Sequence, residues 1–342
     1  MSTLTPVLNE EAFIRETVAA LQAQDVAAEA EFLFMDGRST DRTKQLLEEL
    51  AAEDPRIRVL DNPTRHTASG LNVGLRAARG EYVARIDAHT YYPAHYLSRG
   101  IERLREGDVA WVSGPQVPIP AGGWSADVAL ALSTPLATGR SNRWDSDVTH
   151  RGGGEVELAT GVFTGIWRRA TLDRLGGWDE GWPINQDSEM AARVLRNGGR
   201  IVSLPALRAG YAPRDSLRKL ARQYLRYGMY RAKTSLRHPS TVRPGHVAMP
   251  ALVCAAASAL VAPPPLRRAA RAGMGLYGAA LAAQTARLAS ANGTAALRVP
   301  VVLVTMHACW GAGYLAGLVL FAPPSRRRPR LATDLATRSG DD

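Results

Sequence analysis

The first 110 residues alternate between short apolar runs and longer segments in which apolar residues recur three or four positions apart. The short runs are typical of strands, and the periodic segments are typical of helices. The predicted strands are 2–7, 30–36, 57–62 and 81–87, and the predicted helices are 9–24, 42–53 and 68–80. This alternation predicts an α/β fold with a mostly parallel sheet covered by helices.

Three polar runs follow the predicted strands directly. The run "NEE" begins at residue 9, "DGRSTD" begins at residue 36, and "DAH" begins at residue 87. In open parallel sheets, ligands bind beyond the carboxyl ends of the strands. We therefore expect these three runs to line a binding site.

After about residue 244 the pattern changes to long apolar segments, at 247–262, 272–286 and 299–322. A helix of about 20 apolar residues spans the core of a bilayer. The third segment meets this length, and His307 is its only commonly ionisable side chain. The first two segments also suit helices that lie in the membrane interface. A buried helix of a soluble domain remains the alternative for each segment.

The basic loops predict how these segments meet the membrane. Loops rich in Lys and Arg tend to stay cytoplasmic, and the chain has two, at 266–271 and 326–330. Both stay inside if the second and third segments cross and the first lies along the inner surface. The nearly uncharged stretch 290–298 is then outside, and the C-terminus is cytoplasmic.

Charge and cysteine content narrow the function classes. The formal net charge is +10, and much of the excess lies beyond residue 214, interleaved with the apolar segments. This placement favours an anionic membrane surface over nucleic acid, because no basic platform with interleaved aromatic residues is present. The two cysteines, Cys254 and Cys309, lie in apolar segments, so neither a zinc site nor a disulfide framework is predicted. No signal-peptide pattern opens the chain, so we expect the N-terminal part in the cytoplasm.

Several acids near the predicted strand ends are candidates for donor binding. Asp36 ends a strand, where its carboxylate can accept hydrogen bonds from a ligand, whereas Asp41 suits the N-cap of the next helix. Glu10 and Glu11 can accept from ribose hydroxyls, or they can simply favour a helix N-terminus.

Asp87 and His89 stand two residues apart in "RIDAH". In an extended segment this spacing places both side chains on one face, so both can reach one metal ion. Mn²⁺ or Mg²⁺ suits a mixed oxygen and nitrogen site that also uses diphosphate oxygens. A surface turn is the alternative for an isolated D-x-H sequence.

Asp187 opens a predicted helix in "NQDSEMAARVLR". An acid is favoured at a helix N-terminus for electrostatic reasons alone. It can also act as the general base that removes a proton from an acceptor hydroxyl. Glu189, two residues further on, is the second candidate for this base.

The runs "PVLNE", "DGRSTD", "DAH" and "NQDSE" occur in an order and spacing that resemble the family 2 glycosyltransferases of the GT-A fold, and most closely the succinoglycan-biosynthesis-type branch. The resemblance covers about residues 4–230 and continues into the apolar tail. Two departures occur: Gln186 stands where the family has Glu before the catalytic acid, and Tyr227 replaces Trp in a Q-x-x-R-W motif.

The resemblance implies roles for individual residues. The residues expected to bind the nucleotide sugar are Pro6, Asn9, Glu10, Asp36, Asn72 and Asp87. Asp36 would contact the base, Glu10 the nucleoside, and Asp87 with His89 the metal–diphosphate. Asp187 would be the catalytic base.

The segment 215–233 predicts a basic amphipathic helix, with apolar and aromatic residues on one stripe and cations elsewhere. Such a helix suits a membrane surface. Its "QYLRYG" motif implies that Gln223, Arg226 and Tyr227 bind the acceptor or the diphosphate, since an arginine can pair two phosphate oxygens. The alternative is that these basic side chains are simply solvated and bind no ligand.

The whole sequence predicts four regions: a catalytic domain at 1–214, the basic helix region at 215–245, membrane-associated helices at 246–325, and a tail at 326–342. The predicted activity is inverting transfer of a sugar from a nucleotide diphosphate sugar, assisted by Mn²⁺ or Mg²⁺. The predicted acceptor is a hydroxyl of a saccharide on a polyprenyl diphosphate, in the synthesis of exopolysaccharide or cell-envelope glycan at the bacterial cell membrane.

Two other functions stay open. A polyprenyl-phosphate sugar synthase would use a phosphate acceptor and need no strong base. A catalytically inactive nucleotide-sugar-binding scaffold is suggested by the short first strand. The Gly-rich stretch 149–157 is a candidate lid over the site.

Overall fold

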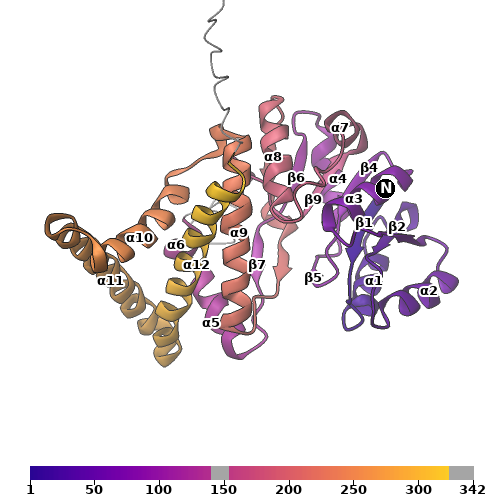
Figure 1. Cartoon of the computed structure of the whole chain (residues 1–342). Coiled ribbons are helices and arrows are strands. Elements are labelled where there is room, and N and C mark those ends of the chain that lie inside the picture. Colours follow the sequence, from indigo (N-terminus) through magenta and orange to yellow (C-terminus); the bar gives the residue numbers. More distant parts are fainter. Residues whose placement is uncertain (140–153, 323–342) are drawn as a thin grey trace, which may run out of the picture.

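The computed structural model describes residues 1–139 and 154–322 (Figure 1). Within them an eight-stranded sheet has the order β3-β2-β1-β4-β9-β6-β10-β8. Its strands are β1 (Ser2–Val7), β2 (Glu31–Asp36), β3 (Ile57–Asp61), β4 (Tyr82–Arg85), β6 (Trp111–Ser113), β8 (Val156–Glu157), β9 (Gly165–Arg168) and β10 (Ile201–Ser203).

The first four strands and the helices between them agree with the prediction. Strands β1 to β4 pair in parallel, whereas β9 runs antiparallel to β4 and β6. The connecting helices are α1 (Ile14–Gln22), α2 (Thr43–Glu53) and α3 (Thr67–Ala77). Helix α1 begins later than predicted, because the backbone N–H groups of Phe13 and Ile14 both bond to the carbonyl of Glu10 in a turn.

Helices cover both faces of the sheet, which explains why the strands are apolar on both sides. One face packs on α1, α2 and α4 (Tyr96–Arg105), through residues such as Val18, Leu47 and Leu97. The other face packs on α3, α7 (Arg169–Leu175) and α8 (Gln186–Arg196), through residues such as Leu71 and Met190. The mixed α/β architecture predicted from the sequence is therefore present.

A second, three-stranded sheet brings distant segments together beside the main sheet. Its order is β5-β11-β7, with β5 (Thr90–Tyr91), β7 (Gln116–Pro118) and β11 (Ala209–Tyr211). Strand β5 follows "DAH" directly, and β11 leads into α9 (Leu217–Arg237). The pairing of Gly210 with Tyr91 therefore places the start of α9 close to the D-x-H segment.

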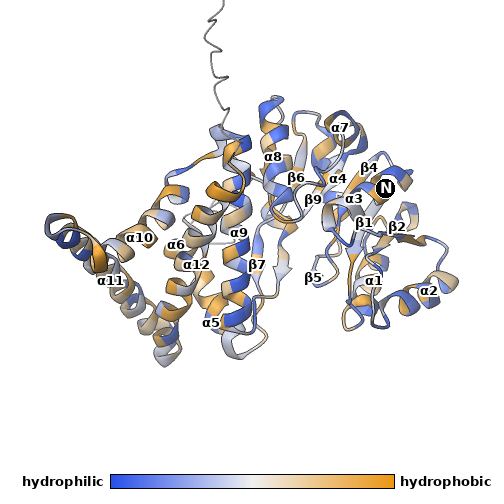
Figure 2. Cartoon of the chain, viewed as in Figure 1, coloured by the Kyte–Doolittle hydropathy of each residue, from blue (hydrophilic) through white to orange (hydrophobic). Residues whose placement is uncertain are grey.

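The C-terminal helices form a layer beside α9 (Figure 1). They are α10 (Pro244–Val261), α11 (Pro264–Asn292) and α12 (Val299–Leu320), and α5 (Gly123–Leu132) and α6 (Pro135–Thr138) join them from the catalytic region. Figure 2 shows apolar residues over α10, α11 and α12 and many polar ones along α9. By length and hydropathy, Pro244–Val261 and Pro264–Leu320 are the two stretches of the described chain that could cross a membrane.

Helix α12 packs along α9, and glycines make the close approach possible. A Cβ atom at Gly313 would lie 2.0 Å from the carbonyl oxygen of Leu225, and one at Gly317 would lie 2.4 Å from that of Met229. Because both contacts advance together along the two chains, the helices run in the same direction. The backbones touch where a side chain would not fit.

The N-terminal half of α12 is attached to the catalytic region. Arg298 pairs with Asp127 of α5 at 3.5 Å, and a ring nitrogen of His307 lies 3.0 Å from the carbonyl oxygen of Leu136 in α6. These contacts are incompatible with the predicted topology, which puts 290–298 across the membrane from the catalytic domain. Hydropathy misled that prediction, because it does not distinguish burial against α5 and α9 from burial in lipid.

Candidate active site

The site lies where β1 and β4 separate. Their pairing runs from Ser2 opposite Val83 to Leu4 opposite Arg85, and its last hydrogen bond joins the N–H of Ile86 to the carbonyl of Leu4 at 2.9 Å. Pro6, which has no N–H to donate, stands just beyond this point on β1. The predicted donor-binding runs follow from both strands at this edge.

Asp87 is held in one orientation. Both of its carboxylate oxygens accept from Arg85, at 2.8 Å from Nε and 3.0 Å from Nη2, and its backbone N–H donates to the hydroxyl oxygen of Tyr92 at 3.0 Å. Arg85 is only 5% exposed. Burial raises the pKa of Tyr92 well above its ordinary value, so the phenol stays protonated at neutral pH. Asp87 is thus a carboxylate fixed by a buried guanidinium.

His89 pairs with Glu10, a contact that the sequence analysis did not predict. Nδ1 of His89 lies 3.1 Å from Oε1 of Glu10, although the residues are 79 positions apart. This hydrogen bond raises the pKa of His89 above its ordinary value, while burial opposes the shift. A carboxylate on one ring nitrogen fixes the ring and leaves Nε2 as the nitrogen that can bind a ligand.

The two donor-binding loops are joined by hydrogen bonds. Asn9, whose φ is +57°, accepts from the backbone of Thr40 at 2.8 Å, and the backbone of Glu10 donates to the hydroxyl of Thr43 at 2.7 Å. Asp41 accepts from the backbone of Thr43 at 3.0 Å, but the N-cap of α2 is Arg42 and not Asp41 as predicted. The side chain of Asn9 therefore holds this loop in shape.

Asp36 ends β2 and is 3% exposed. Both carboxylate oxygens lie 3.3 Å from the backbone N–H of Ser39, so the side chain closes the turn between β2 and α2. Hydrogen bonds of this length are weak, so the carboxylate can still accept a stronger hydrogen bond from another donor.

Asn72 has a different environment from the other predicted donor-binding residues. Its amide donates to the carbonyl of Trp178 at 2.8 Å and to Glu180 at 2.9 Å, and its oxygen accepts from the N–H of Trp178 at 2.8 Å. These bonds tie α3 to the loop before α8. Its polar contacts in the described structure are therefore structural, and none is with the residues at the strand ends.

Asp187 lies in the first turn of α8, after Asn185 with φ of +65°, and is partly buried. Burial lowers the pKa of Arg85, but the charge and hydrogen bonds of Asp87 and the charge of Asp187 together raise it. Burial also raises the pKa of Tyr227 to about 12, with a contribution from Asp187. Asp187 is therefore near both the Asp87–Arg85 pair and the tyrosine of α9.

Glu189, the second candidate for the base, is fully engaged elsewhere. It is 2% exposed, and both oxygens accept from Nε of Arg193 at 2.9 Å. Oε1 also lies 3.3 Å from Nε2 of His238, just after α9. Glu189 joins α8 to the end of α9, so it is not available as a base.

The predicted motif on α9 faces the small sheet. Gln223 donates to the hydroxyl oxygen of Tyr211 in β11 at 3.2 Å and to that of Tyr227 at 2.9 Å. Tyr227 is 39% exposed. Arg226 is exposed to solvent. The motif therefore extends from the site towards solvent along one side of α9.

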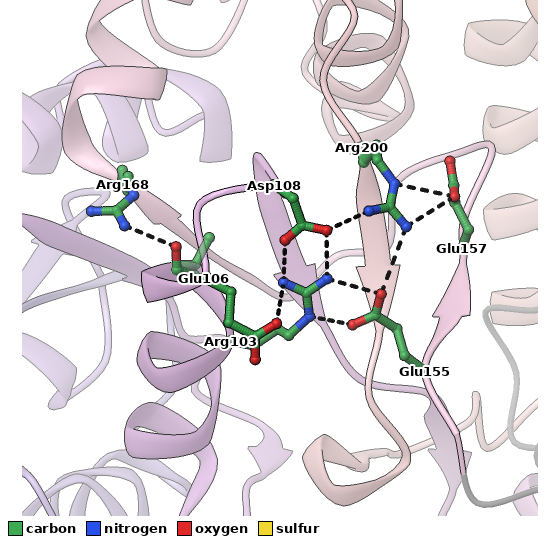
Figure 3. A network of polar contacts seen from close by, with 8 residues as sticks. Arg103, Glu106, Asp108, Glu155, Glu157, Arg168 and Arg200 are labelled. Carbon is green, nitrogen blue, oxygen red and sulfur yellow. Dashed lines mark hydrogen bonds and ion pairs between the residues drawn. The ribbon is translucent and has the colours of Figure 1, made fainter.

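Other residues form an ion-pair network that links α4 to the start of β10 (Figure 3). Arg103 of α4 pairs with Asp108 and Glu155, and Arg200 pairs with Asp108 and Glu157. Hydrogen bonds from Arg103 lower the pKa of Asp108 to about 2. The network holds Glu155 and Glu157 beside β10. The rest of the predicted lid, 149–153, lies outside the described residues.

Comparisons with known proteins agree with this geometry. The glycosyl transferase family 2 model matches residues 2–173. The succinoglycan biosynthesis protein ExoA of Rhizobium meliloti (strain 1021) is 31% identical over 329 residues, which cover 92% of this chain and 94% of that protein. This chain belongs to glycosyl transferase family 2. It is a glycosyltransferase.

Two further similarities help to place this family 2 glycosyltransferase. A Methanococcus voltae protein, the dolichyl N-acetyl-alpha-D-glucosaminyl phosphate 3-beta-D-2,3-diacetamido-2,3-dideoxy-beta-D-glucuronosyltransferase, is 26% identical, with 67% of this chain and 71% of that protein covered. The mannosyltransferase PcManGT from Pyrobaculum calidifontis, solved with GDP-Man and Mn²⁺, has a TM-score of 0.60 at 22% identity, covering 93% and 86% of the two chains. The fold is therefore GT-A, as predicted.

The residues of this family 2 glycosyltransferase can supply two donors to a divalent cation. These are the carboxylate of Asp87 and Nε2 of His89. No group of three or more Asp, Glu, His or Cys side chains in residues 1–139 and 154–322 is arranged to hold a metal ion. The D-x-H segment is not extended as predicted, because the N–H of Thr90 donates to the carbonyl of Asp87 at 3.1 Å and closes a turn over 87–90. A cation held here would take its other ligands from diphosphate oxygens and water.

The sequence analysis missed residues that the structure places at the site. Arg85 interrupts the apolar run "YVARI" of a central strand, which is a recognisable signal for a functional cation. Arg214 follows β11, exposed, and near enough to His89 and Tyr227 for its charge to act on both. The sequence position of Arg214 gave no signal for this role, because only the pairing of β5 with β11 brings Arg214 close to the D-x-H segment.

Proposed function

We propose that the protein is an inverting glycosyltransferase that moves a sugar from a nucleotide diphosphate sugar to a hydroxyl of a membrane-borne saccharide. The acceptor is carried on a polyprenyl diphosphate, and the product enters exopolysaccharide or cell-envelope glycan synthesis. The observation that carries the proposal is that the charge of Asp187 acts both on Arg85, the partner of Asp87, and on Tyr227 of α9.

On the donor side, Asp36 binds the base, Glu10 binds the nucleoside, and Asp87 with His89 lies at the diphosphate. Asp87 and His89 would hold a divalent cation, and an imidazole ligand favours Mn²⁺ over Mg²⁺. When bound, such a cation neutralises charge on the leaving diphosphate. The solved mannosyltransferase with GDP-Man and Mn²⁺ supports this assignment by its fold.

On the acceptor side, Asp187 accepts the proton of the attacking hydroxyl, which makes the oxygen a better nucleophile. Gln223, Arg226 and Tyr227 lie on the helix that borders this position, where a guanidinium can pair with diphosphate oxygens. The relatives named for succinoglycan and for a dolichyl-linked sugar support a lipid-linked acceptor.

Membrane attachment through the C-terminal helices completes the proposal, with the catalytic domain in the cytoplasm. Large apolar residues are exposed along α10, α11 and α12, for example Leu260 at 75%, Leu276 at 74% and Val319 at 82%. So much exposed apolar surface on neighbouring helices is typical of contact with lipid or a partner protein.

Thermal unfolding of the detergent-solubilised protein with a panel of nucleotide sugars tests the proposed function. A donor that binds the folded state raises the unfolding temperature by mass action. We expect one or a few nucleotide sugars to protect, and Mn²⁺ to increase the protection. A panel in which no nucleotide sugar protects, with or without Mn²⁺, would contradict the proposal.

Replacing Asp36 by asparagine tests the donor side separately. We expect KM for the donor to rise about tenfold or more with a smaller change in kcat, because the base is remote from the reacting carbon. Asp61→Asn is the matched control, since Asp61 ends the neighbouring strand β3 and pairs with exposed Arg38. A large loss of kcat at unchanged donor KM would show that Asp36 acts elsewhere.

A further inference from the structure

Arg85 is an unusual residue for its position. Strand β4 lies between β1 and β9 in the middle of the main sheet, and its residues are buried. A guanidinium buried at this depth needs a partner that offsets the loss of hydration. The residue opposite it in β9 is Gly165, which has no side chain to provide one.

The partner is Asp87. The guanidinium donates to both carboxylate oxygens, and the side chains of Arg85 and Asp87 are 6% and 17% exposed. The opposite charges of the pair cancel, and each oxygen of Asp87 already accepts a hydrogen bond. A cation that binds Asp87 must therefore share its oxygens with the guanidinium, and it meets the repulsion of that positive charge at short range.

The described side chains near Asp87 offer a free cation few further ligands. His89 shares its Nδ1 with Glu10, so it contributes one ring nitrogen. In the parts of the chain that the structure describes, no third acidic, histidine or cysteine side chain completes a cation site. A diphosphate, in contrast, brings several negatively charged oxygens together with the cation.

We propose that Arg85 is a positioning residue that holds the affinity of Asp87 for a free divalent cation low, so that the cation enters the site together with the donor diphosphate. This inference rests on the proposed function. The guanidinium acts through Asp87, to which it donates two hydrogen bonds. Binding of a free cation to the site without the donor diphosphate is therefore disfavoured.

Titration of the solubilised full-length protein with Mn²⁺ alone, followed by electron paramagnetic resonance, tests the inference without any turnover. We expect Arg85→Gln to bind Mn²⁺ about tenfold more tightly than the wild type, because Asp87 loses its counter-ion. Arg85→Lys should tighten binding by a smaller factor, since an ammonium keeps the charge but not the two-oxygen contact. In Arg85→Gln/Asp87→Asn the gain should disappear.

Arg58→Gln is the matched control, because Arg58 on β3 pairs with Glu31 at 2.7 Å at the other end of the strands. It should leave Mn²⁺ affinity unchanged. Circular dichroism establishes that each variant is folded, and Arg85→Lys carries the test if Arg85→Gln is not. Unchanged or weaker Mn²⁺ binding in the folded Arg85 variant would overturn the inference.

Adding UDP or GDP separates this inference from the proposed function. In the wild type, we expect one of these nucleotides to tighten Mn²⁺ binding by tenfold or more. If neither does so, the proposed donor site fails, while the effect of Arg85 on free Mn²⁺ is judged by the nucleotide-free titrations alone.

Discussion

Asp187→Asn is expected to lower kcat by about 10²- to 10⁴-fold, the range that a general base contributes. An asparagine of nearly the same size keeps the shape of the first turn of α8 but cannot accept the proton of the acceptor hydroxyl. The donor KM should change little, because the proposed role of Asp187 is with the acceptor hydroxyl and not with the nucleotide. Steady-state kinetics with a hydroxyl-bearing acceptor measures both constants.

Asp179→Asn is the control for this prediction. Asp179 lies in the loop before α8, and its carboxylate accepts from the N–H of Gly181 at 2.9 Å. It should retain most of the activity, since its role is to shape a turn. If Asp187→Asn also retains most of the activity, the base is wrongly assigned.

The same variant distinguishes the two transferase functions. A phosphate acceptor is already ionised and does not need a base, so a polyprenyl-phosphate sugar synthase would lose much less turnover. A large loss with a hydroxyl acceptor therefore supports a saccharide acceptor, and a small loss with a polyprenyl phosphate supports the synthase.

Gly313→Ala and Gly278→Ala are expected to change stability in opposite directions. Both glycines lie inside helices, where alanine normally stabilises by about 0.5–1 kcal/mol. At Gly278 no atom lies within 4 Å of the added Cβ, so the stabilisation should be seen. At Gly313 the added Cβ would lie 2.0 Å from a backbone oxygen of α9, which cannot rotate away.

We therefore expect Gly313→Ala to destabilise by about 1–3 kcal/mol, as overpacking of a close contact does. Because α9 carries Gln223 and Tyr227, its displacement should also reduce activity. Thermal unfolding of both variants in the same detergent measures the difference. A higher unfolding temperature for Gly313→Ala would mean that α12 does not pack on α9 in solution.

The local elements of the catalytic domain were predictable because their signals are short-range. Strands β1 to β4 and helices α1 to α3 follow from apolar periodicity and from the turn residues between them. The order of the motifs also predicted the family. The start of α1 was predicted too early, since the acidic residues Glu10 and Glu11 resemble a first helical turn while the backbone forms a separate turn there.

The contacts within the site depend on tertiary structure. The sequence predicted that Glu10, Asp87 and His89 would lie at strand ends, but their partners depend on the pairing of β1 with β4. That pairing sets Glu10 against His89, across 79 residues. It also buries the guanidinium of Arg85 against Asp87, although an arginine side chain is ordinarily expected at the surface.

The C-terminal helices show most clearly which features the sequence predicts and which depend on tertiary packing. Composition alone predicted long apolar helices after residue 244, and the structure contains them. What α12 packs against was decided by shape, because glycines at 313 and 317 let its backbone touch α9, and Arg298 reaches Asp127. Hydropathy measures the transfer of a side chain out of water and is the same for burial in lipid and in protein. Only the packing of the helices distinguishes the two.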